Sequence, residues 1–432
     1  MMPAARLSAA MEVLQDIQER RRPAPDALKD WGLARRFAGS KDRAAVASLV
    51  YDALRRKASS AHVMQAETPR ALVLAMLIGV RKLNADEIGA LCTGTAHAPE
   101  PLSETEAAQL AAFDLASAPD WVQADAPEWL WPSIVTSFGG KAIAEMQALA
   151  TRAFVDVRAN TLKQKRSVLR GKLQHLSPED TPWSPDGLRF AVGEDGRGPA
   201  LQAEQVFFEG GFEIQDEGSQ LVTQLSGTRP GMTVVDLCAG AGGKTLALAA
   251  LMQNEGTLIA SDLDTRRLAP LHDRLARSGA TCVDIRAPKG RGHDALADLD
   301  GTADLVLVDA PCTGSGTWRR NPDAKWRVRP GALTERLKDQ ATVLARAARL
   351  VKPGGRIAYI TCSVLADEND GAVAAFLARH AGFRTQSTAE LIAQSKSDLS
   401  LLKPFATQHG LQLSPLRTGT DGFYLAGLVQ RF

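Results

Sequence analysis

The chain has 432 residues, 45% of them apolar, and its 51 lysines and arginines nearly balance its 49 acids. This length allows two or three globular domains with ordinary cores. The net charge of +2 excludes a strongly basic tail as the means of binding nucleic acid, so such binding would need local basic patches.

The cysteines and the apolar runs predict the compartment. Five cysteines without a C-x-x-C pair favour a reduced, cytoplasmic protein over a disulfide scaffold. The amino terminus lacks the apolar core of a signal peptide, and the longest uncharged apolar run, residues 71–80, is too short to cross a bilayer. We therefore expect no membrane role.

Residues 1–120 are predicted to form an all-helical domain. Apolar residues recur there at helical spacing, and Ser103-x-x-Glu106 has the pattern of a capping box at a helix start. Basic clusters at 20–22 and 55–57 fit either a solvated helix surface or one that faces RNA.

Residues 121–215 are predicted to form a small α/β domain. A stretch rich in Trp and Pro near residue 120 marks the boundary. It is followed by a strand at "FVDVRAN", a basic helix near 163–173 and short strands at "GLRFAV" and "FEIQDEG".

Residues 216–432 alternate between strand and helix patterns. The strand candidates are "TVVDLC", "GTLIASD", "TCVDIRA", "ADLVLVDAP" and "RIAYITCS". Such alternation predicts an α/β fold with a parallel, doubly wound sheet that binds its ligand at the carboxyl ends of the strands.

The stretch "DLCAGAGGKT" at 236–245 follows the first of these strands. It is not a phosphate-binding P-loop, because Cys238 holds the place of the first glycine. It is not a dinucleotide fingerprint, because Thr245 stands where the third glycine is required. Two interpretations remain: a turn whose backbone touches a ligand, or a plain strand-to-helix turn.

Other strands also end in reactive side chains. Asp262 follows the second strand and fits either an acceptor for ribose hydroxyls or a simple turn residue. Asp309 and Cys312 follow the fourth strand, and Cys362 follows the fifth. Because these strand ends meet at one edge of the sheet, we expect both thiols to lie beside the ligand. Cysteines outside this pair are expected to be core residues, Cys238 with its backbone near the ligand; these are Cys92, Cys238 and Cys282.

The loop after Cys312, "TGSGTWRRNPDAKWR", interleaves basic and aromatic residues. This composition suits a nucleic-acid strand whose bases stack on aromatic side chains. We expect its cationic and aromatic side chains to face RNA; these are Arg319, Arg320, Lys325, Arg327 and Arg329 with Trp318 and Trp326.

Four motifs carry a family resemblance: "DAPCTGSGTWRRNPDAKW", "LVKPGG", "ITCSVLADEN" and "DGFYLA". They resemble the RNA cytosine-5 methyltransferases of the Sun family over roughly residues 125–432. "VRANTLK" and "EIQDEGSQL" resemble that family's RNA-recognition-motif-like domain, and the first helices, with "LVYDALRR", resemble the antitermination factor NusB.

The resemblance implies a class I methyltransferase Rossmann-like fold for residues 216–432. It implies that Cys362 is the nucleophile, that Cys312 assists release of the product, and that Asp309 hydrogen-bonds the cytosine. The implied cofactor is S-adenosyl-L-methionine. The residues expected to bind it are Cys238, Ala239, Gly240, Ala241, Gly242, Gly243, Lys244, Asp262 and Asp309.

Two departures accompany the resemblance. Ala241 stands where the family usually has Pro, and the third strand lacks an acid at the expected adenine contact, since Asp284 lies too early. The expected partner is RNA, with ribosomal RNA favoured, and the expected state is a monomer. The alternative is a non-catalytic RNA-binding protein of the antitermination type, which would need neither cysteine.

Overall fold

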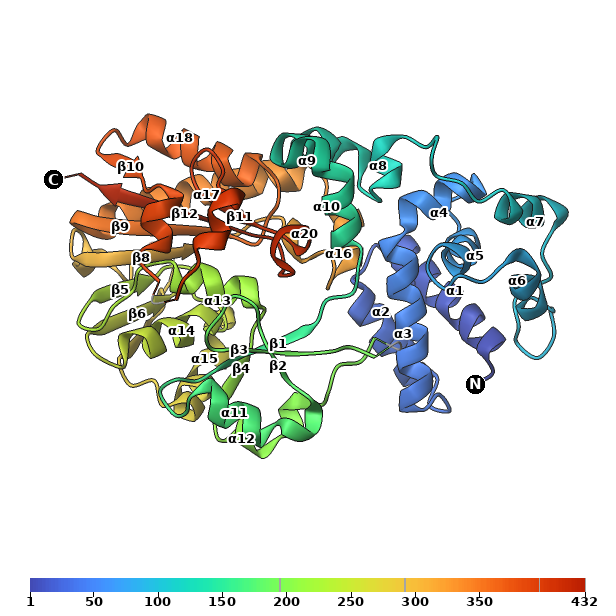
Figure 1. The fold of residues 1–432 in the computed structure, drawn as a ribbon, viewed down its shortest axis with the longest axis horizontal. Coiled ribbons are helices and arrows are strands. Elements are labelled where there is room, and N and C mark those ends of the chain that lie inside the picture. Colours follow the sequence, from blue (N-terminus) through green and yellow to red (C-terminus); the bar gives the residue numbers. More distant parts are fainter. Residues whose placement is uncertain (194–195, 291–292, 396, 432) are drawn as a thin grey trace. The chain divides into compact units, whose positions relative to one another are not determined.

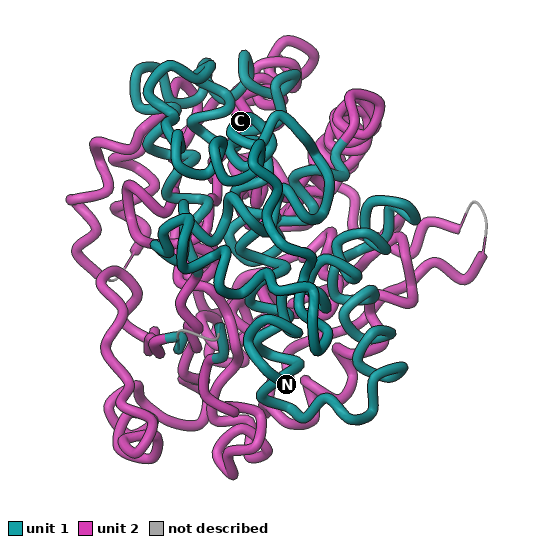
Figure 2. The backbone as a smooth tube through the Cα atoms, turned by 90° about the vertical axis from the view of Figure 1, so that its right-hand side faces the viewer, with its two compact units in different colours: residues 1–152, 192–197, 318–328 teal, residues 153–191, 198–317, 329–432 magenta. Residues whose placement is uncertain are grey.

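The computed structural model describes residues 1–193, 196–290, 293–395 and 397–431. It contains two compact units, coloured separately in Figure 2. Unit 1 comprises Met1–Arg152, Val192–Arg197 and Trp318–Val328. Unit 2 comprises Ala153–Ala191, Gly198–Thr317 and Arg329–Phe432. No helix among the described residues is long and apolar enough to cross a membrane.

Unit 1 is helical, as the apolar spacing predicts. Buried residues of α1, α3 and α5 form its core, with Leu14, Val50 and Leu74 among them. The capping box at α7 is confirmed, because the Ser103 side chain accepts from the Glu106 backbone and the Glu106 side chain accepts from Ser103. The helices are α1 (Pro3–Arg20), α2 (Ala24–Ala34), α3 (Ser40–Arg55), α4 (Lys57–Met64), α5 (Pro69–Gly79), α6 (Ala85–Leu91), α7 (Glu104–Ala111), α8 (Asp120–Gln123), α9 (Trp131–Phe138), α10 (Ala142–Leu149) and α16 (Pro322–Arg327).

Unit 2 begins with a small antiparallel sheet in the order β2-β3-β1-β4. One face packs its apolar residues, such as Val157, Leu188 and Phe212, against α11 and α12. The other face carries charged side chains: Arg158 donates to Gln215 Oε1 at 2.7 Å. The elements are β1 (Val155–Ala159), α11 (Arg166–Lys172), β2 (Glu179–Asp180), β3 (Gly187–Phe190), α12 (Gln205–Phe208) and β4 (Phe212–Ile214).

The larger sheet of unit 2 has 8 strands in the order β10-β12-β9-β8-β5-β6-β7, with β11 paired to β12. The strands from β9 to β7 are parallel, and β12 is antiparallel to β9. This arrangement confirms the predicted doubly wound, class I methyltransferase-like sheet. Its strands are β5 (Thr233–Asp236), β6 (Thr257–Ser261), β7 (Val283–Arg286), β8 (Ala303–Asp309), β9 (Val351–Thr361), β10 (Phe383–Thr385), β11 (Leu411–Leu413) and β12 (Phe423–Gln430).

Alternate residues of the central strands face opposite layers of helices. Val306 and Tyr359 pack against α17 and α18, whereas Leu305 and Ile360 pack in the cluster that contains α13 and α14. Figure 1 shows α17 and α18 on one side of this sheet and α13, α14 and α15 on the other. The helices are α13 (Glu217–Gln224), α14 (Gly243–Met252), α15 (Thr265–Ser278), α17 (Pro330–Leu350), α18 (Ala372–Arg379), α19 (Thr388–Ile392) and α20 (Pro415–Thr418).

The order of the parallel strands reverses between β5 and β8, because β6 lies on one side of β5 and β8 on the other. In doubly wound sheets, ligands bind at such a reversal, outside the carboxyl ends of the strands. The loops that follow β5, β8 and β9 therefore define the candidate site.

Candidate active site

The loop between β5 and α14 turns sharply at two glycines. Gly240 has φ +51° and Gly242 has φ +83°, a region in which residues with a Cβ are strained. A Cβ on Gly242 would lie 2.1 Å from Leu271 Cδ1 of α15, so no side chain fits there. Gly243 then opens α14. The loop thus passes close to α15 and exposes backbone at a helix start, where an anionic or polar ligand group can bind.

Asp236 closes β5 directly before this loop. Its Oδ2 accepts from Thr245 Oγ1 at 2.7 Å, but its Oδ1, although buried, has no hydrogen-bond partner among the described residues. Burial raises the pKa of Asp236 from 3.8 to about 7. A buried carboxylate oxygen without a partner is costly in a finished fold, which marks Asp236 as a group that a ligand can satisfy.

Asp262 lies at the end of β6 and holds the glycine loop. Its Oδ2 accepts from Gly240 N at 3.0 Å and pairs with Arg267 Nη1 at 3.2 Å, while its Oδ1 accepts from Asp264 N at 3.0 Å. The neighbouring Ala239 N donates to Ser261 O at 2.9 Å. Asp262 therefore contacts the glycine loop, and its contact with ribose stays a prediction.

Lys244 and Asp309 form a charged pair across the site. Lys244 Nζ donates to Asp309 Oδ2 at 2.7 Å and lies 5.2 Å from the centre of the Phe423 ring. Burial alone would lower the pKa of Lys244, but the charges of Asp309 and of the Cys362 sulfur outweigh it and the pKa is raised. Lys244 is thus a buried cation that balances negative charge on either partner.

The two predicted thiols meet. Cys312 Sγ lies 3.5 Å from Cys362 Sγ, and both cysteines are free. The hydrogen bond to Cys362, together with burial, raises the pKa of Cys312 well above its ordinary value, so Cys312 retains its proton. Burial likewise raises the pKa of Cys238, which makes its thiol unreactive. Cys238 packs with the core of the sheet, as predicted.

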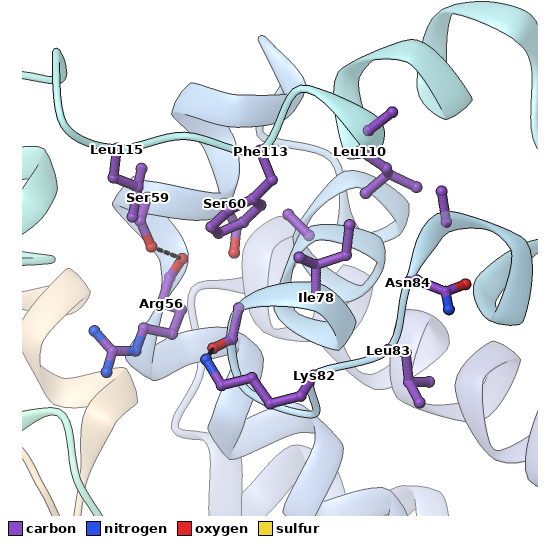
Figure 3. Close-up of a pocket in the computed structure, with 14 residues that line it drawn as sticks. Arg56, Ser59, Ser60, Ile78, Lys82, Leu83, Asn84, Leu110, Phe113 and Leu115 are labelled. Atoms are coloured by element: carbon purple, nitrogen blue, oxygen red, sulfur yellow. Dashed lines mark hydrogen bonds between the residues drawn. The ribbon is translucent and has the colours of Figure 1, made fainter.

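A cavity in unit 1 offers a second place for a ligand (Figure 3). Its volume is about 670 Å³, and Arg56, Lys82, Asn84 and Phe113 contribute to its wall. The described residues that line it include no cysteine, histidine or carboxylate. It can hold a molecule, but its described lining offers no carboxylate, imidazole or thiol of the kind that meets at the strand ends of unit 2.

The basic loop after Cys312 differs from its prediction. Trp318, Arg319 and Lys325 are 1%, 3% and 2% exposed, so the prediction that they face RNA is wrong for these three. Residues 318–328 fold into the helical unit instead. Trp326 Nε1 donates to Leu54 O at 2.7 Å, and the backbone oxygen of Arg319 accepts from Arg55 Nη2 at 2.9 Å.

The part of the chain that holds this site matches a known protein family. Residues 224–429 match the family model described as "16S rRNA methyltransferase RsmB/F". Residues 224–429 therefore belong to the RsmB/F methyltransferase family. This membership confirms the resemblance to the Sun family.

Relatives of this chain extend the match beyond residues 224–429. It is 31% identical over 307 residues to ribosomal RNA small subunit methyltransferase B of Sodalis glossinidius, covering 70% of this chain and 65% of that relative. The chain thus spans just under two thirds of the relative's length. The crystal structure of PH0851 matches 99% of each chain with 25% identity and a TM-score of 0.71. A methyltransferase homologue from Pyrococcus horikoshii shares the fold, with a TM-score of 0.57 and 23% identity over 72% of this chain and 97% of that one.

The structure shows the contacts made at the two positions, Ala241 and Asp284, where the sequence departs from the family pattern. Ala241 presents its carbonyl oxygen to Arg274 Nη1 at 2.6 Å, so the backbone rather than the side chain makes the contact. Asp284 pairs with Arg286 at 2.8 Å on β7. Sequence reasoning gave no role to Asp236, although it ends a strand as Asp309 does, or to Glu368, which lies in the motif after Cys362.

Proposed function

We propose that this chain is an S-adenosylmethionine-dependent RNA cytosine-5 methyltransferase, with ribosomal RNA as the substrate class that its relatives' names support. The observation that carries the proposal is the 3.5 Å separation of the Cys312 and Cys362 sulfurs beside the Asp309–Lys244 pair. Methylation at carbon 5 of cytosine needs a thiol to attack the ring and a means of releasing it again. A non-catalytic RNA-binding protein would need neither thiol.

The residues present fit the cofactor. The Gly240–Gly242 turn packs against Arg267 and Leu271 of α15 and presents only backbone at the start of α14, and the unpartnered Asp236 Oδ1 supplies a buried acceptor for a polar or cationic group. Residues 238–244 would hold the cofactor by their backbone, and Asp262 would accept from its ribose. When bound, S-adenosylmethionine supplies a methyl group on a positively charged sulfur.

Cys362 would begin the reaction. Carbon 5 of cytosine is too weak a nucleophile by itself, so the Cys362 thiolate adds to carbon 6 and turns the ring into an enamine. Negative charge that develops toward nitrogen 3 would be stabilised by Asp309, which would hydrogen-bond the ring as the resemblance implies, and by the buried Lys244 ammonium that pairs with Asp309. After methylation, loss of the hydrogen on carbon 5 allows the sulfur–carbon 6 bond to break and Cys362 leaves as thiolate.

The assignment of the two thiols is supported by their surroundings. A nucleophilic cysteine must react as thiolate, and Lys244 places a cation near Cys362. Cys312 keeps its proton because contact with Cys362 and burial raise its pKa. The resemblance assigns product release to Cys312, and its contact with the Cys362 sulfur would place it where it can assist that step.

We assign RNA binding and methyl transfer to the three regions that the sequence predicts. Residues 1–120 and 121–215 would bind RNA, and residues 216–432 would carry out methyl transfer. We retain these boundaries as a proposal.

The test is methylation of defined RNA. Purified protein, labelled S-adenosylmethionine and transcripts of ribosomal RNA should give label in RNA, and bisulfite sequencing should locate it at a cytosine. Comparison of total RNA from cells with and without the gene identifies the site. Label at another base would contradict the cytosine-5 assignment, and an RNA-binding protein that transfers no methyl group would favour the non-catalytic alternative.

A further inference from the structure

Glu368 is a fully buried carboxylate in the segment η7 (Asp367–Gly371), a π-helical turn. Its carboxylate accepts four hydrogen bonds. Oε1 accepts from Thr313 N at 2.8 Å and from Gln340 Nε2 at 3.1 Å. Oε2 accepts from Thr313 Oγ1 and from Ser363 Oγ, each at 2.5 Å.

The donors are the neighbours of the two thiols. Thr313 directly follows Cys312, and Ser363 directly follows Cys362. A single oxygen, Oε2, therefore joins the residue after one cysteine to the residue after the other. Gln340 adds a third connection, since its Nε2 also donates to Pro311 O at 3.0 Å, directly before Cys312.

We propose that Glu368 is a positioning residue whose carboxylate clamps the loops after β8 and β9 so that the Cys312 and Cys362 sulfurs stay in contact. An effect of Glu368 on methyl transfer rests on the proposed function. The positioning of the two thiols by Glu368 does not depend on that function. Glu368 itself is held to β9, because its backbone oxygen accepts from Tyr359 OH at 2.7 Å.

The four contacts of Glu368 favour a carboxylate over an amide. All four groups that face Glu368 are donors, and an ionised carboxylate offers acceptor sites to all of them. An amide at this position would turn one oxygen into an NH₂ group, so the Thr313 and Ser363 hydroxyls would have to accept from it and give up their own bonds to Glu368. Glu368→Gln thus keeps the volume and weakens the clamp. Direct links remain, such as Gly316 N to Cys362 O at 2.9 Å, so we expect loosening rather than collapse.

The experiment measures thiol apposition without reference to RNA. Oxidised glutathione converts the two thiols to a Cys312–Cys362 disulfide and is itself reduced to two molecules of glutathione, by two successive thiol–disulfide exchanges. The rate is followed in the full-length protein by mass spectrometry of the linked peptides. Glu368→Gln should slow it by about tenfold or more, the factor expected from losing hydrogen bonds to a charged group.

The matched control is Glu217→Gln in the same unit. Glu217 is also fully buried and its Oε1 accepts from Trp183 N at 2.6 Å and Ser184 N at 2.8 Å, away from either cysteine. It should lower stability but leave the disulfide rate near that of the wild type. Equal rates in folded Glu368→Gln and wild type would overturn the proposal, as would equal slowing in both variants.

Ser363→Ala provides a second test should Glu368→Gln fail to fold, because it removes one donor to Glu368, together with the contacts of that hydroxyl with Leu365 N and Ser315 Oγ. It should slow disulfide formation several-fold, and an unchanged rate would overturn the clamp. In methylation assays, Glu368→Gln should lower kcat with little change in the Kd for S-adenosylmethionine. Absence of methylation by the wild type would refute the proposed function but leave the disulfide result standing.

Discussion

At the scale of single residues, the protonation of Asp236, which lies directly before the glycine loop, makes the stability of the fold depend on pH. Burial raises the pKa of Asp236 from 3.8 to about 7. Between these values the unfolded chain releases the proton while the folded chain keeps it, so the free energy of unfolding falls as pH rises. The contribution is complete below pH 3.8 and is lost as pH passes through about 7.

Asp236→Asn should remove this dependence. Asparagine keeps an acceptor for Thr245 but does not ionise. Urea unfolding at about pH 5 and about pH 8 should show a smaller loss of stability in the variant than in the wild type. Equal losses in both proteins would mean that Asp236 does not hold a raised pKa in the folded state.

At the scale of elements, the glycine loop can be tested with a matched pair. Gly242 and Gly231 have nearly the same φ, +83° and +82°. A Cβ on Gly231 meets nothing within 4 Å, whereas one on Gly242 would lie 2.1 Å from Leu271 Cδ1. Both alanine variants carry the backbone strain, but Gly242→Ala also forces the Leu271 side chain, α15 or the loop to shift.

Gly242→Ala should therefore weaken binding of S-adenosylmethionine in calorimetry by about 1–3 kcal/mol, since the loop must shift. Gly231→Ala should lower stability by about 1 kcal/mol without changing that affinity. Similar cofactor affinities for the two variants would remove the loop from the binding site.

The elements also show where sequence patterns succeed and fail. The strands ending at Asp236, Asp309 and Thr361 could be predicted, because apolar runs followed by turn residues have a local cause. The burial of Lys325 could not, because it depends on a segment far away in the sequence: Lys325 Nζ donates to Arg55 O at 3.4 Å. Glu368 was hidden for the same reason: its four donors come from three separate segments.

At the scale of the whole molecule, charge decides how RNA can be held. A net charge of +2 gives little long-range attraction, so RNA affinity must come from patches. Arg319 and Lys325 are buried and cannot form such a patch. Arg170 and Lys172 on α11 are candidates instead, because their side chains are 49% and 46% exposed.

Replacing Arg170 and Lys172 with Gln should weaken RNA binding and flatten its salt dependence by about 0.7–0.9 in logarithmic slope for each phosphate that the variant no longer neutralises. The control is the same change at Arg336 and Lys338 on α17, which are similarly exposed and also paired with acids. Filter binding over a salt series measures both slopes. Identical slopes for the two double variants would exclude α11 from the RNA surface.

The central claim is that Cys362 attacks cytosine and Cys312 allows its release, and trapping of the covalent intermediate tests it most directly. Each cysteine is replaced by alanine, and each variant is mixed with ribosomal RNA and S-adenosylmethionine before a denaturing gel. Cys312→Ala should attack, transfer the methyl group and then stall, giving a denaturant-resistant protein–RNA adduct. Cys362→Ala should give no adduct and no methylation. An adduct with Cys362→Ala and none with Cys312→Ala would reverse the assignment, and full methylation by both variants would contradict the covalent mechanism.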